Sequence, residues 1–118
     1  MKHKMNLHPE PYEMIKSGIK TIELRLNDEK RSLVSFGDTI VFTNTRTKNQ
    51  IETTVTNIYK FNSFEELYIE LPLEKCGYTK LELSTAKASD MIPYYSMDKQ
   101  VKYGVLGIEV IFLKEHLI

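Results

Sequence analysis

The sequence of 118 residues contains a single cysteine, Cys76, and no tryptophan. One cysteine excludes an intrachain disulfide, and it also excludes a zinc site built mainly from thiolates. We expect Cys76 to be a buried or inert thiol rather than a catalytic nucleophile.

The sequence also lacks an excess of charge of either sign and any long apolar run. Sixteen Lys and Arg residues balance sixteen Asp and Glu residues. Proteins that coat long duplexes usually carry a basic excess, so any contact with nucleic acid would be local, through a patch or a pocket. No segment approaches the roughly 20 apolar residues that span a bilayer, and residues 1–7 do not resemble a signal peptide. We therefore expect a cytoplasmic protein that does not enter a membrane.

Internal repeats, low-complexity tracts and linkers rich in Pro, Gly or Ser are missing as well. Apolar residues make up 42% of the chain, which is enough for a core at this length and argues against disorder. The sequence therefore predicts one domain over residues 1–118.

The first part of the chain has the pattern of a strand, a helix and a second strand. Residues 3–8 predict a short strand, and Pro9 and Pro11 suit the first turn of a helix. Gly18 is placed to end that helix in the left-handed conformation. In residues 20–26 the period changes to two, which predicts a strand with Ile22, Leu24 and Leu26 on one face and Thr21, Glu23 and Arg25 on the other.

The rest of the chain predicts more strands than helices. Residues 39–44 and 51–61 indicate a hairpin, and residues 105–113 a long central strand. Ser63 and Glu66 fit a capping box at the start of a helix that ends before Pro72, and a further helix is expected over residues 85–91. Together these elements predict an α+β fold, a small mixed or antiparallel β-barrel with flanking helices.

Lys20, Glu23 and Arg25 are the charged residues of the strand over residues 20–26. Alternate residues of a strand lie about 6 to 7 Å apart, so Glu23 and Arg25 can share a pocket. Lys20 falls on the opposite face unless a turn or bulge opens the strand. The pattern alone favours a solvated charged face. In a pocket, the guanidinium would instead suit a phosphate or a base edge.

Residues 18–25, GIKTIELR, resemble the GxKxxExR signature of the ASCH family. Residues 8–18 are similar to the first strand and helix of that family, and residues 25–31 and 37–42 to its loop and following strand. Residues 94–96 and 103–108 are similar to its C-terminal helix and closing strand. The resemblance covers nearly the whole chain and implies a PUA-like β-barrel with an RNA-binding cleft lined by Lys20, Glu23 and Arg25.

The same resemblance implies a possible activity. Some small ASCH proteins are amidohydrolases that remove the acetyl group of N4-acetylcytidine, and their catalytic lysine matches Lys20. Those enzymes have a threonine where this chain has Glu23, which makes Glu23 a second candidate catalytic residue that could relay protons. They also use a distal glutamate, for which the order along the chain offers Glu65, Glu66, Glu70 and Glu74.

Four further residues are candidates for contacts with a ligand. Lys30 and Arg31 could bind phosphates at the mouth of the cleft, with a solvated loop as the alternative. Tyr94 and Tyr95 could stack on a base, with a place in the core as the alternative. His3, His8 and His116 are too scattered to predict a metal site, and no motif for a cofactor is present.

Three hypotheses about function follow. The first is a module that binds RNA or a modified nucleoside in the cleft. The second is an amidohydrolase for N4-acetylcytidine-type nucleosides with Lys20 catalytic, or, less well supported, a ribonuclease. The third is an accessory domain that binds a protein partner in RNA metabolism, for which neutral charge is suitable.

Overall fold

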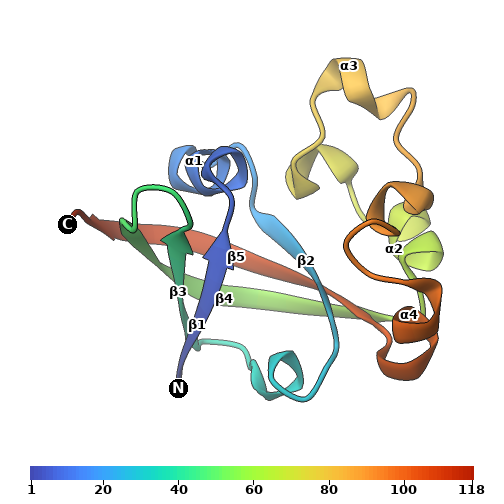
Figure 1. Ribbon diagram of the computed structural model, residues 1–118, viewed down its shortest axis with the longest axis horizontal. Helices are drawn as coiled ribbons and strands as arrows, with labels where there is room; N and C mark the ends of the chain where they lie inside the picture. The colour runs from blue at the N-terminus through green and yellow to red at the C-terminus, as the bar shows by residue number, and fades with distance from the viewer.

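The computed structural model describes residues 1–118, which form one five-stranded sheet and a helical region inserted between the last two strands (Figure 1). The strands are β1 (Lys2–Leu7), β2 (Ile22–Leu26), β3 (Thr39–Asn44), β4 (Gln50–Phe61) and β5 (Val105–His116). The α-helices are α1 (Pro9–Ser17), α2 (Phe64–Glu70), α3 (Lys80–Leu83) and α4 (Met97–Tyr103). Short 3-10 turns are η1 (Arg31–Leu33), η2 (Leu73–Cys76) and η3 (Ala88–Met91). The predicted α+β class is confirmed.

The sheet has the strand order β1-β3-β4-β5-β2, with β1 parallel to β3 and every other pair antiparallel. The predicted hairpin is β3 and β4, and the last strand is central, since β5 pairs with both β4 and β2.

The predicted β-barrel is wrong, because the sheet does not close on itself. The edge strands β1 and β2 share no backbone ladder. A side chain connects the two edge strands in place of a ladder: Arg25 Nη2, on β2, donates a hydrogen bond to the carbonyl of Asn6, on β1, at 2.7 Å. The strand β2 is only five residues long and pairs along its length with β5, so the sheet stays open between its two edges.

Local signals explain where the elements begin and end. Gly18 ends α1 with a φ of +83°, as expected for a left-handed cap. Ser63 accepts a hydrogen bond from the backbone N–H of Glu66 and so caps α2, which ends before Pro72. The predicted helix over residues 85–91 is present only in part, as the 3-10 turn η3 over Ala88–Met91. Thr79 and Glu82 form a capping box that starts α3 earlier, and the extended backbone of Lys87 separates α3 from η3.

Two clusters of buried side chains form the core. The larger one lies between α1 and the strands β1, β3, β4 and β5, and the smaller one joins β2 to α2 and η2. The strand β2 contributes Ile22, Leu24 and Leu26 to the smaller cluster, which confirms the predicted apolar face. The molecule therefore has a sheet half and a helical half, and β2 lies at their boundary (Figure 1). No helix has the length and apolar character needed to span a bilayer.

Candidate functional site

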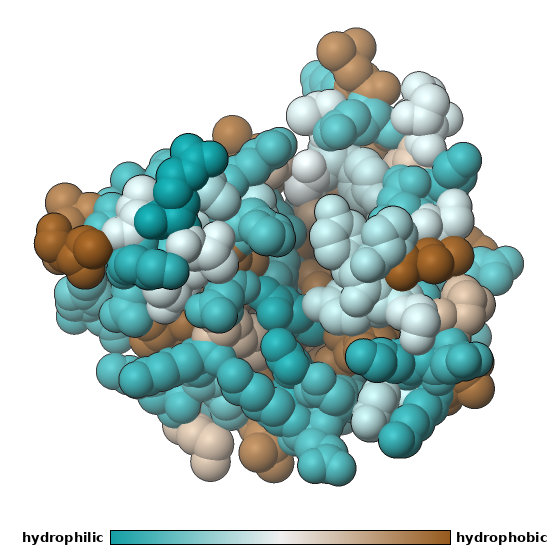
Figure 2. All heavy atoms as spheres, viewed as in Figure 1, coloured by the Kyte–Doolittle hydropathy of each residue, from teal (hydrophilic) through white to brown (hydrophobic).

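A cavity of about 510 Å³ opens at the boundary between the two halves, on the side of β2 that faces α1 and η2. The space-filling view shows the surface hollowed between α1 and the segment that carries α3 (Figure 2). Its volume lies within the roughly 300–1,000 Å³ that sites for small molecules occupy.

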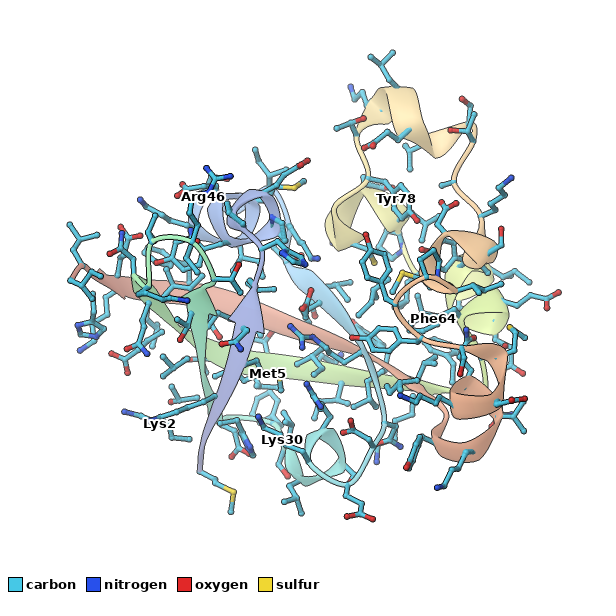
Figure 3. All side chains as sticks on the ribbon, viewed as in Figure 1. Lys2, Met5, Lys30, Arg46, Phe64 and Tyr78 are labelled. Carbon is cyan, nitrogen blue, oxygen red and sulfur yellow. The ribbon has the colours of Figure 1, made fainter.

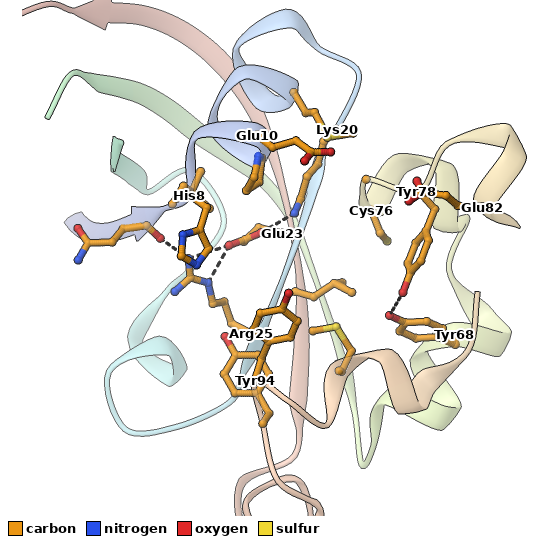
Figure 4. A pocket seen from close by; sticks show the side chains of 18 residues that line it. His8, Glu10, Lys20, Glu23, Arg25, Tyr68, Cys76, Tyr78, Glu82 and Tyr94 are labelled. Atoms are coloured by element: carbon orange, nitrogen blue, oxygen red, sulfur yellow. Dashed lines mark hydrogen bonds and ion pairs between the residues drawn. The ribbon is translucent and has the colours of Figure 1, made fainter. Parts of the chain in front are cut away.

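Lys20, Glu23 and Arg25 form one wall of this cavity (Figure 4). Lys20 Nζ lies 2.8 Å from Glu23 Oε1, and Arg25 Nη2 lies 2.7 Å from Glu23 Oε2. Arg25 Nε also donates to Glu23 Oε2 at 2.8 Å. The side chains keep only 11%, 6% and 12% of their surface exposed, so the alternative of a solvated charged face is wrong.

The turn that follows α1 brings Lys20 to the same side as Glu23. The N–H of Lys20 donates to the carbonyl of Met14, and the N–H of Thr21 donates to that of Lys75. The regular strand begins only at Ile22. The strict alternation that would turn Lys20 away from Glu23 therefore does not apply.

Glu23 is ionised in this arrangement. Burial alone would favour the neutral carboxyl, but the attraction of Lys20 and then of Arg25 is stronger in sum and lowers the pKa of Glu23. Burial acts against the charge of Arg25 as well, while the carboxylate of Glu23 raises the pKa of this guanidinium. The three groups together carry one net positive charge, since two cations share one anion.

Tyrosines form the opposite wall of the cavity. Tyr78 donates to Asp90 Oδ2 at 2.9 Å, and its hydroxyl is also bonded to that of Tyr68. A hydroxyl has one hydrogen, so Tyr68 is the donor in that second bond. Tyr95 is part of the helical core, where its ring stacks on Phe64 with centroids 5.7 Å apart. Tyr94 stands at the cavity with 68% of its surface exposed.

Cys76 also faces the cavity, and its thiol donates to the carbonyl of Pro72. Burial raises the pKa of Cys76 to about 12, which keeps the sulfur protonated at neutral pH. This agrees with the prediction of a buried, inert thiol.

Other residues singled out in the sequence lie elsewhere. Lys30, which is labelled in Figure 3, and Arg31 do not line the cavity. Arg31 Nη1 instead pairs with Asp28 Oδ2 at 2.8 Å. His3 and His116 bind separate carboxylates, and only His8 reaches the cavity. The structure contains no group of three or more His, Cys, Asp or Glu side chains that could hold a metal.

Two carboxylates of the cavity were missed from the sequence. The four glutamates suggested by chain order, Glu65, Glu66, Glu70 and Glu74, do not line it, whereas Glu10 and Glu82 do. The carboxylate of Glu82 closes the capping box of α3 by accepting a hydrogen bond from the N–H of Thr79. This bond, followed by the interaction with the Thr79 hydroxyl, lowers the pKa of Glu82. The spacing of Thr79 and Glu82 is a detectable signal for a helix start, but it carries no information about a cavity.

Comparison with known proteins gives this geometry a context. The sequence pattern of the ASCH domain matches residues 5–114. The chain belongs to the ASCH domain family. ASCH domains are PUA-like and generally associated with RNA. No curated protein matches this ASCH chain in sequence.

Solved structures confirm the fold of this ASCH domain. The hypothetical protein PH0355 is 32% identical with a TM-score of 0.80, and the similarity covers 96% of this chain and all of the other. Protein PF0455 from Pyrococcus furiosus is 34% identical with a TM-score of 0.71, over 97% of this chain and 99% of the other. The ASCH protein from Zymomonas mobilis is 16% identical with a TM-score of 0.66, over 98% of this chain and 72% of the other, and so supports the fold alone.

Proposed function

We propose that this ASCH domain binds RNA or a modified nucleoside in the cavity lined by Lys20, Glu23 and Arg25. The observation that carries the proposal is the pairing of a buried charged wall with a wall of tyrosines across about 510 Å³. A nucleobase has the matching chemistry, because its edge carries hydrogen-bond donors and acceptors and its faces are aromatic.

The charged wall keeps hydrogen-bonding capacity for a ligand. An ammonium has three N–H groups, so the single bond of Lys20 to Glu23 leaves two for a ligand in the cavity. The Nε and Nη2 atoms of Arg25 bond within the protein, whereas Nη1 has no partner there. Glu23 Oε1 can accept a second hydrogen bond beside Lys20. The wall therefore offers donors and an acceptor within one small area.

The tyrosines suit the faces of a base. Tyr94 is held in a turn beside the cavity and keeps most of its ring free, which is the state a stacking residue needs before a ligand arrives. The next residue, Tyr95, is partly buried against the smaller core cluster, and its stacking on Phe64 anchors the segment. Stacking on a single aromatic side chain contributes about 1–3 kcal/mol per base and tolerates any base. Tyr94 is thus the proposed stacking residue, and Tyr95 supports it.

An amidohydrolase acting on N4-acetylcytidine-type nucleosides is the second candidate, because two carboxylates, Glu10 and Glu82, line the same cavity as Lys20. Such a reaction adds water to the acetyl amide and releases acetate. Lys20 is paired with Glu23 as an ammonium, which has no lone pair for attack. The arrangement therefore favours Lys20 as a hydrogen-bond donor, and any hydrolysis would need water activated by a carboxylate such as Glu82. Ribonuclease activity and a protein partner have no comparable observation in their favour.

A thermal-shift screen tests the first candidate. The purified protein is heated with nucleosides, including N4-acetylcytidine, and with short single-stranded RNAs. A ligand at about 100 times its Kd stabilises the folded state by about 2.7 kcal/mol, which shifts the Tm of a domain of this size by roughly 10 °C. The same screen is run on Lys20→Met, which keeps the length of the side chain, and on Lys30→Met, whose lysine does not line the cavity.

The outcomes separate the candidates. A shift that Lys20→Met removes and Lys30→Met keeps supports binding at this cavity. Mass spectrometry of the bound ligand then distinguishes binding from turnover, since acetate release identifies the amidohydrolase. The absence of a shift with every nucleoside and RNA would count against the proposed function.

A further inference from the structure

Gly77 ends η2 and lies against the side chain of Lys20. A Cβ atom at position 77 would lie 3.3 Å from Lys20 Cδ and 3.8 Å from both Cε and Nζ. A separation of 3.3 Å is tighter than ordinary van der Waals contact, so the side chain of Lys20 would have to shift by a few tenths of an ångström. The stem of Lys20 therefore occupies space that any side chain at position 77 would need. Figure 4 shows the neighbours Cys76 and Tyr78 across the cavity from Lys20.

The backbone of Lys20 is held on both sides and has little room to compensate. Its own N–H is bonded to Met14 of α1 at 3.0 Å, and the next N–H, from Thr21, is bonded to Lys75 of η2 at 2.9 Å. The side-chain torsions of Lys20 would therefore take up the displacement, and these torsions also set the position of the ammonium. The ammonium is the atom group that reaches Glu23 at 2.8 Å and faces the cavity.

Two other glycines have a positive φ without a neighbouring side chain, so the contact of Gly77 with Lys20 does not follow from the positive φ alone. Gly77 has a φ of +109°, which disfavours other residues. Gly18 and Gly37 have φ values of +83° and +84°, yet a Cβ atom at either position would meet nothing within 4 Å. Gly77 combines the positive φ with close contact to a residue of the cavity wall. Substitution at these glycines can therefore separate backbone strain from displacement of Lys20.

We infer that Gly77 is a positioning residue for Lys20, because its missing side chain lets the ammonium reach Glu23 and the cavity. The part of this inference that concerns ligand affinity rests on the proposed function. The part that concerns the ion pair rests on geometry alone.

The experiment compares Gly77→Ala and Gly77→Asn with Gly37→Ala. Asn adopts positive φ more readily than Ala does, so Gly77→Asn reduces the strain while keeping the Cβ contact. Three quantities are measured for each variant: the Tm, the rate at which an amine-reactive ester labels Lys20 relative to Lys30, and the affinity for N4-acetylcytidine and a short single-stranded RNA. Peptide mapping by mass spectrometry gives the labelling rate of each lysine.

Both Gly77 variants are expected to label several-fold faster at Lys20, because the displaced side chain weakens the ion pair of its ammonium with Glu23. Their affinity for whichever probe binds the unmodified protein is expected to fall by roughly threefold to tenfold, where tenfold is about the size of one fully lost hydrogen bond to a charged group. Gly37→Ala is expected to lower the Tm through strain and leave both other quantities unchanged.

Unchanged labelling of Lys20 in both Gly77 variants would overturn the inference, and the proposed function would stand if the probes still bound. Faster labelling in a protein that binds neither probe would support the positioning role and remove the proposed function instead.

Discussion

Glu23 is a single carboxylate shared by two cations, and its charge holds the cavity wall together. Lys20 and Arg25 each bond a different oxygen of it, and all three side chains are almost buried. In such clusters the loss of one partner costs more than the pair contributes, because it leaves buried charge without compensation. The consequence of neutralising Glu23 should therefore be large.

Glu23→Gln keeps the size of the side chain and removes its charge, which leaves two neighbouring cations without a counter-charge. We expect the free energy of unfolding to fall by about 3–5 kcal/mol. Urea denaturation measures this as a lower midpoint at an unchanged slope. Glu70→Gln is the control, since Glu70 is exposed on α2 and forms no ion pair, and a change within about 0.5 kcal/mol is expected there. Equal midpoints for wild type and Glu23→Gln would contradict this account of the wall.

Tyr94 allows a test of binding without a large cost in stability, because most of its ring is exposed. Tyr94→Ala should weaken binding of the RNA or nucleoside found in the screen by about 1–3 kcal/mol, the contribution of one stacked base. Tyr94→Phe keeps the aromatic face and should bind as the wild type does. Calorimetric titration of the three proteins measures the difference. If Tyr94→Ala binds with unchanged affinity, Tyr94 does not stack on the ligand.

Among the elements, the segment that carries α3 depends on few interactions. Its side-chain anchor is Asp90, which accepts from the hydroxyl of Tyr78 at 2.9 Å and from the N–H of Lys87 at 3.2 Å. Figure 1 shows that this segment projects from the helical half beside α2. Segments with few buried contacts open locally at low free energy. The stability of this side of the cavity can therefore be measured separately from that of the sheet.

Asp90→Ala removes both hydrogen bonds and should loosen residues 79–87. Hydrogen bonds to a charged group contribute about 1.5–3 kcal/mol, so amide exchange in this segment should become roughly 10 to 100 times faster. Hydrogen exchange followed by mass spectrometry measures it, with the strands β3 and β4 as the internal reference that should not change. Asp98→Ala in α4, whose side chain has no hydrogen-bond partner, should leave the segment as it is. Uniformly faster exchange across the sheet would mean that Asp90 supports the whole fold rather than this segment.

Elements with regular periodicity could be predicted from the sequence, and the two walls of the cavity differ in this respect. The strand β2 alternates apolar and polar residues, so its register and the facing of Glu23 and Arg25 follow from a period of two. The tyrosine wall comes from α2, which carries Tyr68, and from the irregular segments around Tyr78 and Tyr94. The helix α2 could be predicted from its capping residues, but the segments around Tyr78 and Tyr94 have no periodicity. These segments lie more than 45 positions from Lys20 in the sequence. Only tertiary packing brings them together.

The burial of Glu23 and the open sheet show two further limits of prediction from sequence. A charged residue on the polar face of a strand is usually solvated, and the sequence gives no sign that the helical half covers it. Barrel closure depends on a ladder between β1 and β2, which are edge strands here. Whether a side chain such as that of Arg25 replaces the ladder is decided by geometry that no local pattern encodes.

At the scale of the whole molecule, several carboxylates along the sheet contribute to the free energy of unfolding through their negative charge. Burial opposes ionisation of Glu23, but Lys20 and Arg25 outweigh it and lower its pKa. His116 and Lys16 lower the pKa of Glu52 and Glu115 through hydrogen bonds. A carboxyl with a lowered pKa binds fewer protons folded than unfolded, so stability rises with pH between the two values. The contribution of these groups is complete above their ordinary pKa of 4.5 and is lost as the pH falls below it.

Asp38 should account for the loss of stability at the lowest pH values. The hydrogen bond from His3 at 2.8 Å, then that from the N–H of Ser35 and the contact with the N-terminus of Met1, lower the pKa of Asp38 from 3.8 to about 2. Its contribution is therefore complete above pH 3.8 and disappears as the pH falls through about 2. Asp38→Asn keeps an oxygen that can accept from Ser35 but cannot ionise. We expect this variant to be less stable than the wild type at pH 5 and to lose stability less steeply between pH 4 and pH 2. Urea midpoints measured across this range test the prediction, and parallel curves for the two proteins would show that Asp38 does not couple folding to protons.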